Sequence, residues 1–203
     1  MKYSLNELAI MGARTGGTLN FMYDVIDSLP DNLIVEGDLI LSYSSIIELP
    51  ENLIVKGNLE AIRTRIKKLP KGLTVEGNLD LKDSWIESLG DDFWIGRNLI
   101  IDNTRLLHLP KIESNIGGSI FARHSSIVTI PENAIIKGTL NLSHGKINRL
   151  PDNLTVNGDL DVSHTPIYTL PNNLKVIGNL YIGNSKIEAI TNNVCVEGSI
   201  YIK

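Results

Sequence analysis

Three histidines occupy the same position of a regular period, since His124, His144 and His164 follow one another at intervals of twenty residues. If each period forms one coil of a stack, the three imidazoles lie on adjacent strands about 5 Å apart. Histidines arranged in this way are a candidate metal site, but no Asp, Glu or Cys joins them in the column to complete a ligand set. We therefore favour a weakly basic surface stripe, or part of a partner contact, over a metal site. The rest of the column is also polar: Tyr23, Tyr43, Arg63, Asp83, Asn103 and Asn184.

The sequence carries no other constellation typical of catalysis. It has no G-x-S-x-G, H-E-x-x-H or C-x-x-C motif and no phosphate-binding P-loop. The recurring V-x-G-x-L is not a nucleotide fingerprint, because its glycines lie a full period apart and stack as a ladder instead of converging in one loop. We therefore expect neither enzymatic activity nor a cofactor.

The period that aligns the histidines extends over nearly the whole chain, and such a period is the signature of a repeat architecture. Two apolar columns follow the glycine column, and most prolines follow a Leu or Ile in a further column. One residue is inserted between Lys111 and Gly118. The glycine column, which Arg97 interrupts, consists of Gly17, Gly37, Gly57, Gly77, Gly118, Gly138, Gly158, Gly178 and Gly198.

One unit reads as a strand followed by a turn. Apolar and polar residues alternate over 156–162, which is typical of a half-buried strand. Ser or Thr then turns the chain, and Leu-Pro ends the segment. A twenty-residue unit cannot bury its own apolar face, so neighbouring units must stack. We predict a mainly all-β protein, a single β-solenoid with leucine-rich-repeat character and about ten coils.

The two ends of the predicted rod differ. Ser4-Leu5-Asn6-Glu7 resembles a capping box, so we expect a short helix over residues 4–13 within an N-terminal cap (1–16) on the solenoid (17–203). The other end stops on a strand with no cap after it, and open coils expose apolar groups and unpaired backbone. We expect homo-oligomers that pair end to end through Val194, Val196, Ile200, Tyr201 and Ile202.

A second candidate contact lies where the repeat fails, between Leu89 and Gly118, because local rules tend to break at functional or strained places. Exposed aromatic residues are frequent anchors of interfaces. Two alternatives stay open, namely random decay of the repeat and stacking of outward side chains along the sheet. The residues predicted to bind a partner are Trp85, Trp94, Arg97, Ile100, Arg105 and Phe121.

Composition narrows the class of partner. The formal net charge is −4, which gives no basic footprint for nucleic acid or for a membrane surface. A single cysteine fits a reducing compartment. The N-terminus lacks the apolar core of a signal peptide, and no apolar run is long enough to span a bilayer. We expect a cytoplasmic protein that binds another protein, with no nucleic acid and no membrane among its partners.

The pattern V-x-G-x-L-x-L-x-x-T/S-x-I-x-x-L-P-x-N-L resembles the short bacterial leucine-rich repeat, and still more the uncharacterised "LPxNLxVxGxLxL" repeat proteins of bacterial and phage genomes. The resemblance covers residues 17–203, with Ser or Thr in place of the usual asparagine ladder. It implies a non-enzymatic protein–protein interaction module, in one form a phage- or bacteria-encoded inhibitor of a host defence protein. The alternatives are a passive structural repeat and a metal-binding protein that uses the histidine column.

Overall fold

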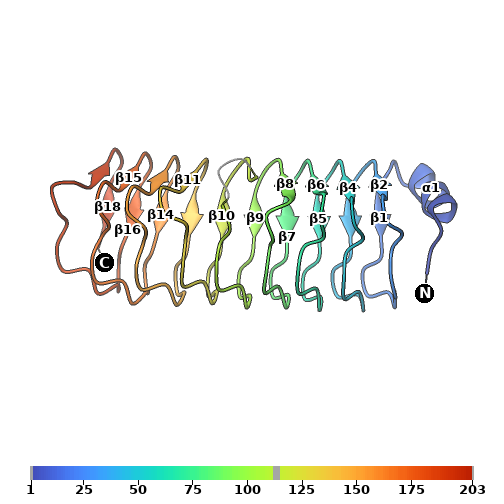
Figure 1. Cartoon of the computed structure of the whole chain (residues 1–203), viewed down its shortest axis with the longest axis horizontal. Coiled ribbons are helices and arrows are strands. Elements are labelled where there is room, and N and C mark those ends of the chain that lie inside the picture. The colour runs from blue at the N-terminus through green and yellow to red at the C-terminus, as the bar shows by residue number, and fades with distance from the viewer. Residues whose placement is uncertain (1, 112–114, 203) are drawn as a thin grey trace.

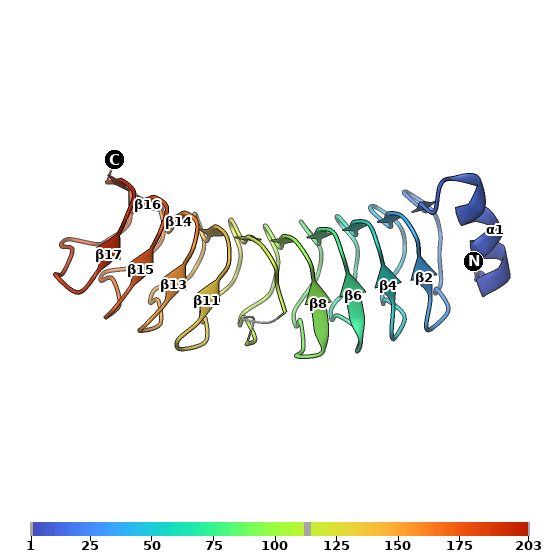
Figure 2. The same cartoon turned by 90° about the horizontal axis from the view of Figure 1, so that it is seen from above.

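The computed structural model describes residues 2–111 and 115–202, and over these the chain winds into a rod of stacked coils with a helix at its N-terminal end (Figure 1). The rod is a β-solenoid of about nine turns, which confirms the predicted fold class. Seen from above, the stack is gently bowed (Figure 2).

One parallel sheet runs along the whole solenoid and takes a two-residue strand from every coil. Equivalent residues pair across it, as Leu39 does with Leu59 and Leu79 with Leu99. The first residue of each strand is buried, except in the last strand, where Ile200 is exposed. The strands are β1 (Leu19–Asn20), β3 (Leu39–Ile40), β5 (Leu59–Glu60), β7 (Leu79–Asp80), β9 (Leu99–Ile100), β10 (Ile120–Phe121), β12 (Leu140–Asn141), β14 (Leu160–Asp161), β16 (Leu180–Tyr181) and β18 (Ile200–Tyr201).

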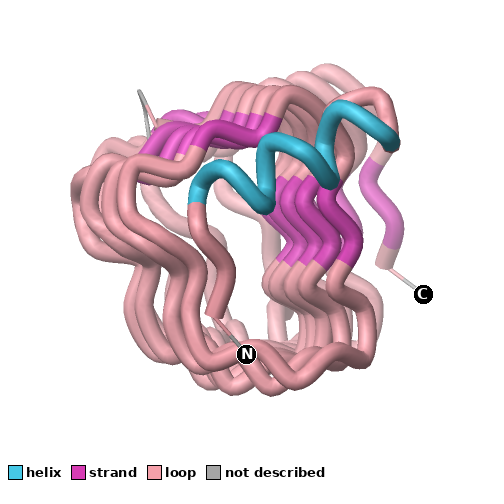
Figure 3. The backbone as a smooth tube through the Cα atoms, turned by 90° about the vertical axis from the view of Figure 1, so that its right-hand side faces the viewer, coloured by secondary structure: helices cyan, strands magenta, loops and turns pink. Residues whose placement is uncertain are grey.

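Two four-stranded parallel sheets follow one another along the rod (Figure 2). They lie on a side of the coils adjacent to the main sheet, as the end-on view shows (Figure 3). In each repeat these strands lie just before the glycine column, whereas the strands of the main sheet lie just after it. The first contains β2 (Ile34–Val35), β4 (Ile54–Val55), β6 (Leu73–Val75) and β8 (Phe93–Ile95), and the second contains β11 (Ile135–Ile136), β13 (Thr155–Val156), β15 (Lys175–Val176) and β17 (Cys195–Val196).

The gap between these two sheets coincides with the irregular segment of the repeat. There an isolated bridge joins Ile95 to Ile116. The backbone of Asn98 reaches back 20 residues to Asn78, whereas that of Ser119 reaches back 21 to Asn98. The register therefore contains the predicted extra residue. The extra residue was predicted between Lys111 and Gly118, and residues 112–114 of that segment lie outside the described residues.

The inward columns of leucine, isoleucine and valine form one continuous core along the axis of the rod. Helix α1 (Leu5–Arg14) closes the N-terminal end of this core, as predicted. Ser4 and Glu7 form the expected capping box, in which each side chain accepts a backbone N–H of the other residue. Leu8 is buried and Met11 packs against the core, so the apolar side of the helix covers the first coil.

Polar side chains directly after the glycine column tie each coil to the next. Asp38 Oδ1 accepts the backbone N–H of Asn58 at 2.6 Å, and Asn58 Oδ1 accepts that of Asn78 at 2.9 Å. The pattern continues through Asn98 to Ser119, at 2.8 Å. These half-buried groups satisfy backbone donors that would otherwise be left without partners at the edge of the main sheet.

A column of Ser and Thr residues follows the main sheet, and those of its side chains that form hydrogen bonds do so within their own coil. It consists of Ser44, Thr64, Ser84, Thr104, Ser125, Thr165 and Ser185. The hydroxyls of Thr64 and Thr104 each donate to the carbonyl three residues earlier, at 2.8 Å, as expected of a residue that stabilises a turn. The buried hydroxyls of Ser44, Ser84 and Ser125 make no hydrogen bond within the described structure. Ser185 makes the same contact as the threonines, to the carbonyl of Ile182 at 2.6 Å, so both residue types can stabilise the turn in this way.

We expect Glu60→Gln to stabilise the protein at neutral pH. Desolvation raises the pKa of the Glu60 carboxyl, and Asp80 and Asp38 raise it further. A carboxyl whose pKa is raised on folding binds its proton more tightly in the folded state, so ionisation destabilises the fold as pH rises through the raised value. Urea denaturation should therefore show a gain for the variant at pH 7 that disappears below the ordinary pKa of glutamate. Equal stability of variant and wild type at pH 7 would contradict this.

Candidate functional site

The predicted histidine column lies on the surface, just after each coil leaves the main sheet. The ring centroids of His124 and His144 are 4.6 Å apart and those of His144 and His164 4.1 Å, with interplanar angles of 16° and 10°. The backbone at all three is left-handed, with φ between 54° and 58°. Asn, Asp and His enter this region more readily than most side chains, which accounts for Asp83 and Asn103 in the same column.

The stacked geometry does not suit a shared metal ion. Imidazole binds a metal along a nitrogen lone pair in the plane of its ring, and zinc requires its ligands to converge on one point at about 2 Å. In parallel rings the lone pairs lie side by side. Instead, Asn184 Nδ2 lies 3.3 Å from Nε2 of His164. Within residues 2–111 and 115–202, no group of three His, Cys, Asp or Glu side chains could hold a metal.

The histidine stack should make stability depend on pH. Desolvation lowers the pKa of His144, and the neighbouring imidazoles of His164 and His124 lower it further. The folded state therefore disfavours the protonated form of His144. The free energy of unfolding is unaffected above the ordinary pKa of about 6.5, and it falls as pH drops below that value. We expect His144→Asn to keep the left-handed turn and to lose less stability than wild type between pH 7 and pH 5 in urea denaturation. Equal losses in the two proteins would contradict this.

One side of the solenoid gathers exposed apolar and aromatic side chains, and we call it the turn face. It consists of the residues between each main-sheet strand and the following Leu-Pro, namely 22–28, 42–48, 62–68, 82–88, 102–108, 123–129, 143–149, 163–169 and 183–189. More than half of the exposed large hydrophobic residues of the described chain lie there, and they are Met22, Tyr23, Val25, Tyr43, Ile47, Trp85, Leu107, Val128 and Tyr168. Such a concentration is typical of an interaction surface.

Trp85 lies on this face with an arginine on either side of its ring. Its indole is 40% exposed and lies between two arginines from the neighbouring coils. The guanidinium carbon of Arg65 is 5.7 Å from the ring centroid and that of Arg105 is 4.8 Å from it. The three residues hold equivalent positions one coil apart, so the repeat itself builds this Arg65–Trp85–Arg105 stack. Exposed cation–π pairs are worth about 0.5–1 kcal/mol each, enough to hold the indole in one orientation.

A second stack continues along the left-handed column. Tyr23 and Tyr43 have ring centroids 5.0 Å apart, and Arg63 lies 5.6 Å from the Tyr43 centroid. Arg63 Nε donates to Asp83 at 3.3 Å, and Asn103 Nδ2 donates to the other oxygen of that carboxyl at 2.7 Å. Asp83 therefore has two partners, which hold the pKa of its carboxyl below the ordinary value.

The other predicted contact residues lie elsewhere. Trp94 is on β8, in a four-stranded sheet, whereas Ile100 and Phe121 are paired neighbours on β9 and β10 of the main sheet. Arg97 lies in the glycine column between these two sheets. The structure thus brings Trp85 together with Arg105, and Ile100 with Phe121, but it places the six residues on more than one side of the rod.

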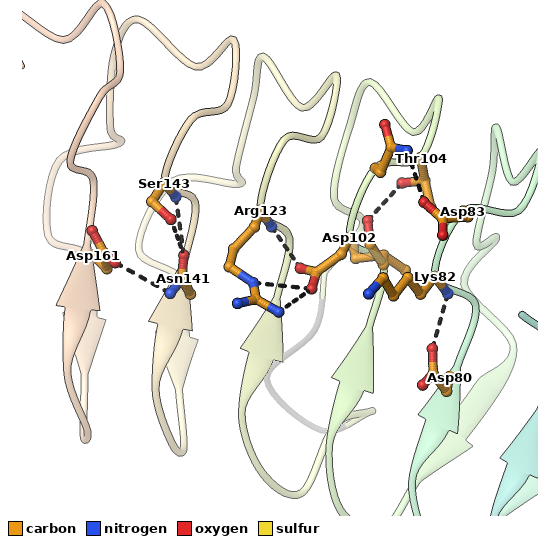
Figure 4. Close-up of polar contacts among 11 residues, drawn as sticks. Asp80, Lys82, Asp83, Asp102, Thr104, Arg123, Asn141, Ser143 and Asp161 are labelled. Carbon is orange, nitrogen blue, oxygen red and sulfur yellow. Dashed lines mark hydrogen bonds and ion pairs between the residues drawn. The ribbon is translucent and has the colours of Figure 1, made fainter.

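An ion pair between the buried Asp102 and the half-exposed Arg123 lies at the start of the turn face, where the coils leave the main sheet (Figure 4). The Asp102 side chain is only 5% exposed, whereas that of Arg123 is 51% exposed. Asp102 Oδ2 accepts Nε of Arg123 at 3.0 Å and Nη2 at 2.7 Å, and Oδ1 accepts the Arg123 backbone N–H at 2.7 Å. Ser42 holds the equivalent position three coils earlier, and its hydroxyl accepts the Ile62 N–H of the next coil at 3.2 Å. The Asp102 carboxylate therefore makes the same contact with the backbone of the next coil as the Ser42 hydroxyl does.

The last coil exposes the apolar residues predicted for oligomerisation. Ile200 and Ile202 are 39% and 66% exposed, although their counterparts in earlier coils are buried. Tyr201 stacks on Tyr181 with centroids 4.7 Å apart, which matches the alternative of stacking along the sheet. Val194 and Val196 are partly buried against the core.

The sequence interpretation missed two parts of this surface. It named Arg105 but not Arg65, although both stand one period from Trp85, and the shared column is the signal that would have identified the stack. It also missed the Asp102–Arg123 pair. There the signal was weaker, because both residues lie in a column of mixed character whose burial the sequence does not reveal.

Comparisons with protein-family models and with curated proteins find no match for this chain. In the part of the chain that the structure describes, no helix is long and apolar enough to cross a membrane.

Proposed function

We propose that the protein is a non-enzymatic interaction module that binds another protein through its turn face. The observation that carries the proposal is the exposed indole of Trp85, fixed between Arg65 and Arg105. Tryptophan and arginine are the residues most enriched at binding hot spots, and an anchor that is already oriented loses little side-chain entropy on binding. A rigid solenoid adds to this advantage, because the coils on either side do not need to rearrange.

The proposed setting follows from the resemblance to bacterial and phage repeat proteins. We propose a cytoplasmic protein, encoded by a bacterium or a phage, that modulates a host protein, with inhibition of a defence protein as one form. The alternative is a passive structural repeat, in which the exposed aromatic side chains serve only to stabilise their own stacks.

The two tryptophans provide a matched pair for the test. Trp85 is 40% exposed on the turn face and Trp94 is 42% exposed on β8. In affinity capture from a bacterial lysate followed by mass spectrometry, we expect Trp85→Ser to lose a protein that both wild type and Trp94→Ser retain. Circular dichroism should first show that both variants fold. If wild type and both variants retain the same proteins, the turn face is not the binding surface.

We propose further that the 203-residue chain pairs end to end through its last coil. The support is the exposure of Ile200 and Ile202 at positions that are buried in earlier coils. Light scattering should give a dimer mass for wild type at micromolar concentration and a monomer mass for Ile200→Glu. A monomer mass for wild type would contradict the pairing without affecting the proposal for the turn face.

A further inference from the structure

We propose that the segment bound by the turn face is acidic, and that Arg65 and Arg105 receive its carboxylates on either side of Trp85. This inference rests on the proposed function and adds the chemistry of the partner. It starts from the geometry of the stack. A guanidinium that stacks on an indole uses only its flat face, which leaves the N–H donors at its edge available to carboxylates.

Neither guanidinium is engaged by an acid in the described part of the chain, where no ion pair or hydrogen bond of the Arg65 or Arg105 side chain is found. The two arginines are two coils apart, so their donor groups flank the indole over roughly 10 Å. Two carboxylates on one segment could therefore pair with both, and bidentate arginine–carboxylate contacts are among the stronger polar interactions.

The charge pattern favours an acidic partner over a basic one. The column that contains Trp85 also holds Arg65, Arg105, Lys146 and Lys186 and no carboxylate, although the chain as a whole has a net charge of −4. Two positions before it, the left-handed column contains one carboxylate, Asp83, which Arg63 and Asn103 already engage. Over the three coils of the stack, the turn-face segments 62–68, 82–88 and 102–108 hold six Lys and Arg residues against three acidic residues, Asp83, Glu87 and Asp102. The field around the stack is thus positive within an acidic molecule, which gives both attraction and selectivity.

A protein segment fits this surface better than a nucleic acid. Proteins that bind single-stranded nucleic acid use a continuous basic groove with several aromatic platforms. On the turn face the aromatic side chains of Tyr23, Tyr43, Trp85 and Tyr168 lie on four different coils, and each already contacts a neighbouring arginine, lysine or tyrosine. A short acidic peptide needs only the two free guanidinium groups and the indole.

The test uses fluorescence anisotropy with three labelled probes: a peptide of alternating glutamate and serine, its glutamine counterpart, and oligothymidylate. The variant Arg65→Gln/Arg105→Gln removes the two charges of the stack. Lys146→Gln/Lys186→Gln is the matched control, because it removes two charges from the same column away from Trp85. We expect the glutamate peptide to bind wild type and the lysine variant alike, and to bind the arginine variant at least about tenfold more weakly.

Two results would overturn the inference. One is equal binding of the glutamate peptide by wild type and by the arginine variant. The other is that the glutamate peptide binds wild type no better than the glutamine peptide or oligothymidylate does. The proposed function has its own outcome in the capture experiment: a protein lost with Trp85→Ser but retained by the arginine variant would keep the turn face as the binding surface and reject the acidic segment.

Discussion

Replacing Arg123 with serine is expected to destabilise the protein by about 3 kcal/mol, because it leaves the carboxylate of Asp102 buried without its cation. The side chain of Asp102 is 5% exposed, so its carboxylate is largely desolvated in the fold. Of its three hydrogen bonds, only the one from the backbone N–H of residue 123 would survive the change. Chemical denaturation in urea measures the loss.

The repeat provides the controls for this prediction. Asp102→Ser alone should cost about 1 kcal/mol or less, because the Arg123 side chain is half exposed and can be hydrated when its partner is removed. The double variant should recover most of the loss of Arg123→Ser, since a serine at 102 can accept the next backbone N–H as Ser42 does. Equal losses for the two single variants, or no recovery in the double variant, would contradict the account.

Replacing Gly77 with alanine is expected to cost about 3 kcal/mol, because the column of glycines is where neighbouring coils approach most closely. A Cβ on Gly77 would lie 2.6 Å from the carbonyl oxygen of Gly57 and 2.8 Å from its carbon. These are backbone atoms, and the Gly77 N–H already donates to the same oxygen at 2.9 Å, so relief requires two coils to separate. Thermal or urea denaturation should show the loss.

Gly90→Ala is the matched control for this change. Gly90 has a φ of +65°, but a Cβ there would meet nothing within 4 Å. Its cost is the conformational term alone, about 1 kcal/mol. The account therefore requires Gly77→Ala to be clearly the more damaging of the two. If Gly90→Ala cost as much or more, close packing of the glycine column would not be the reason for its glycines.

The fold could be predicted from sequence because the same short pattern recurs in every coil, although one copy alone does not determine a fold. A single unit such as 156–162 identifies only a short strand, but ten copies in register require that strand to stack. The irregular segment between Leu89 and Gly118 was likewise visible, and the gap between β8 and β11 begins within it. The capping box at Ser4 and Glu7 was readable because it depends on residues three positions apart.

The site was less predictable because it depends on the side of the rod to which each residue of a coil points. Trp85 and Trp94 are close in sequence, yet half a coil separates them and they lie on different sides of the rod. The period aligns equivalent residues of successive coils but does not give the direction in which each position faces. For the same reason the burial of Asp102 could not be read from a column in which Lys82 is exposed.

The most direct test of the proposed binding surface is site-specific photo-crosslinking in a bacterial cell. A photoreactive amino acid replaces either Leu107, which is 47% exposed on the turn face beside Arg105, or Ile135, which is 45% exposed on β11. We predict a discrete crosslinked product with another protein from position 107 and none from position 135. The same products from both positions, or a product from position 135 alone, would contradict the turn face as the surface through which this protein acts.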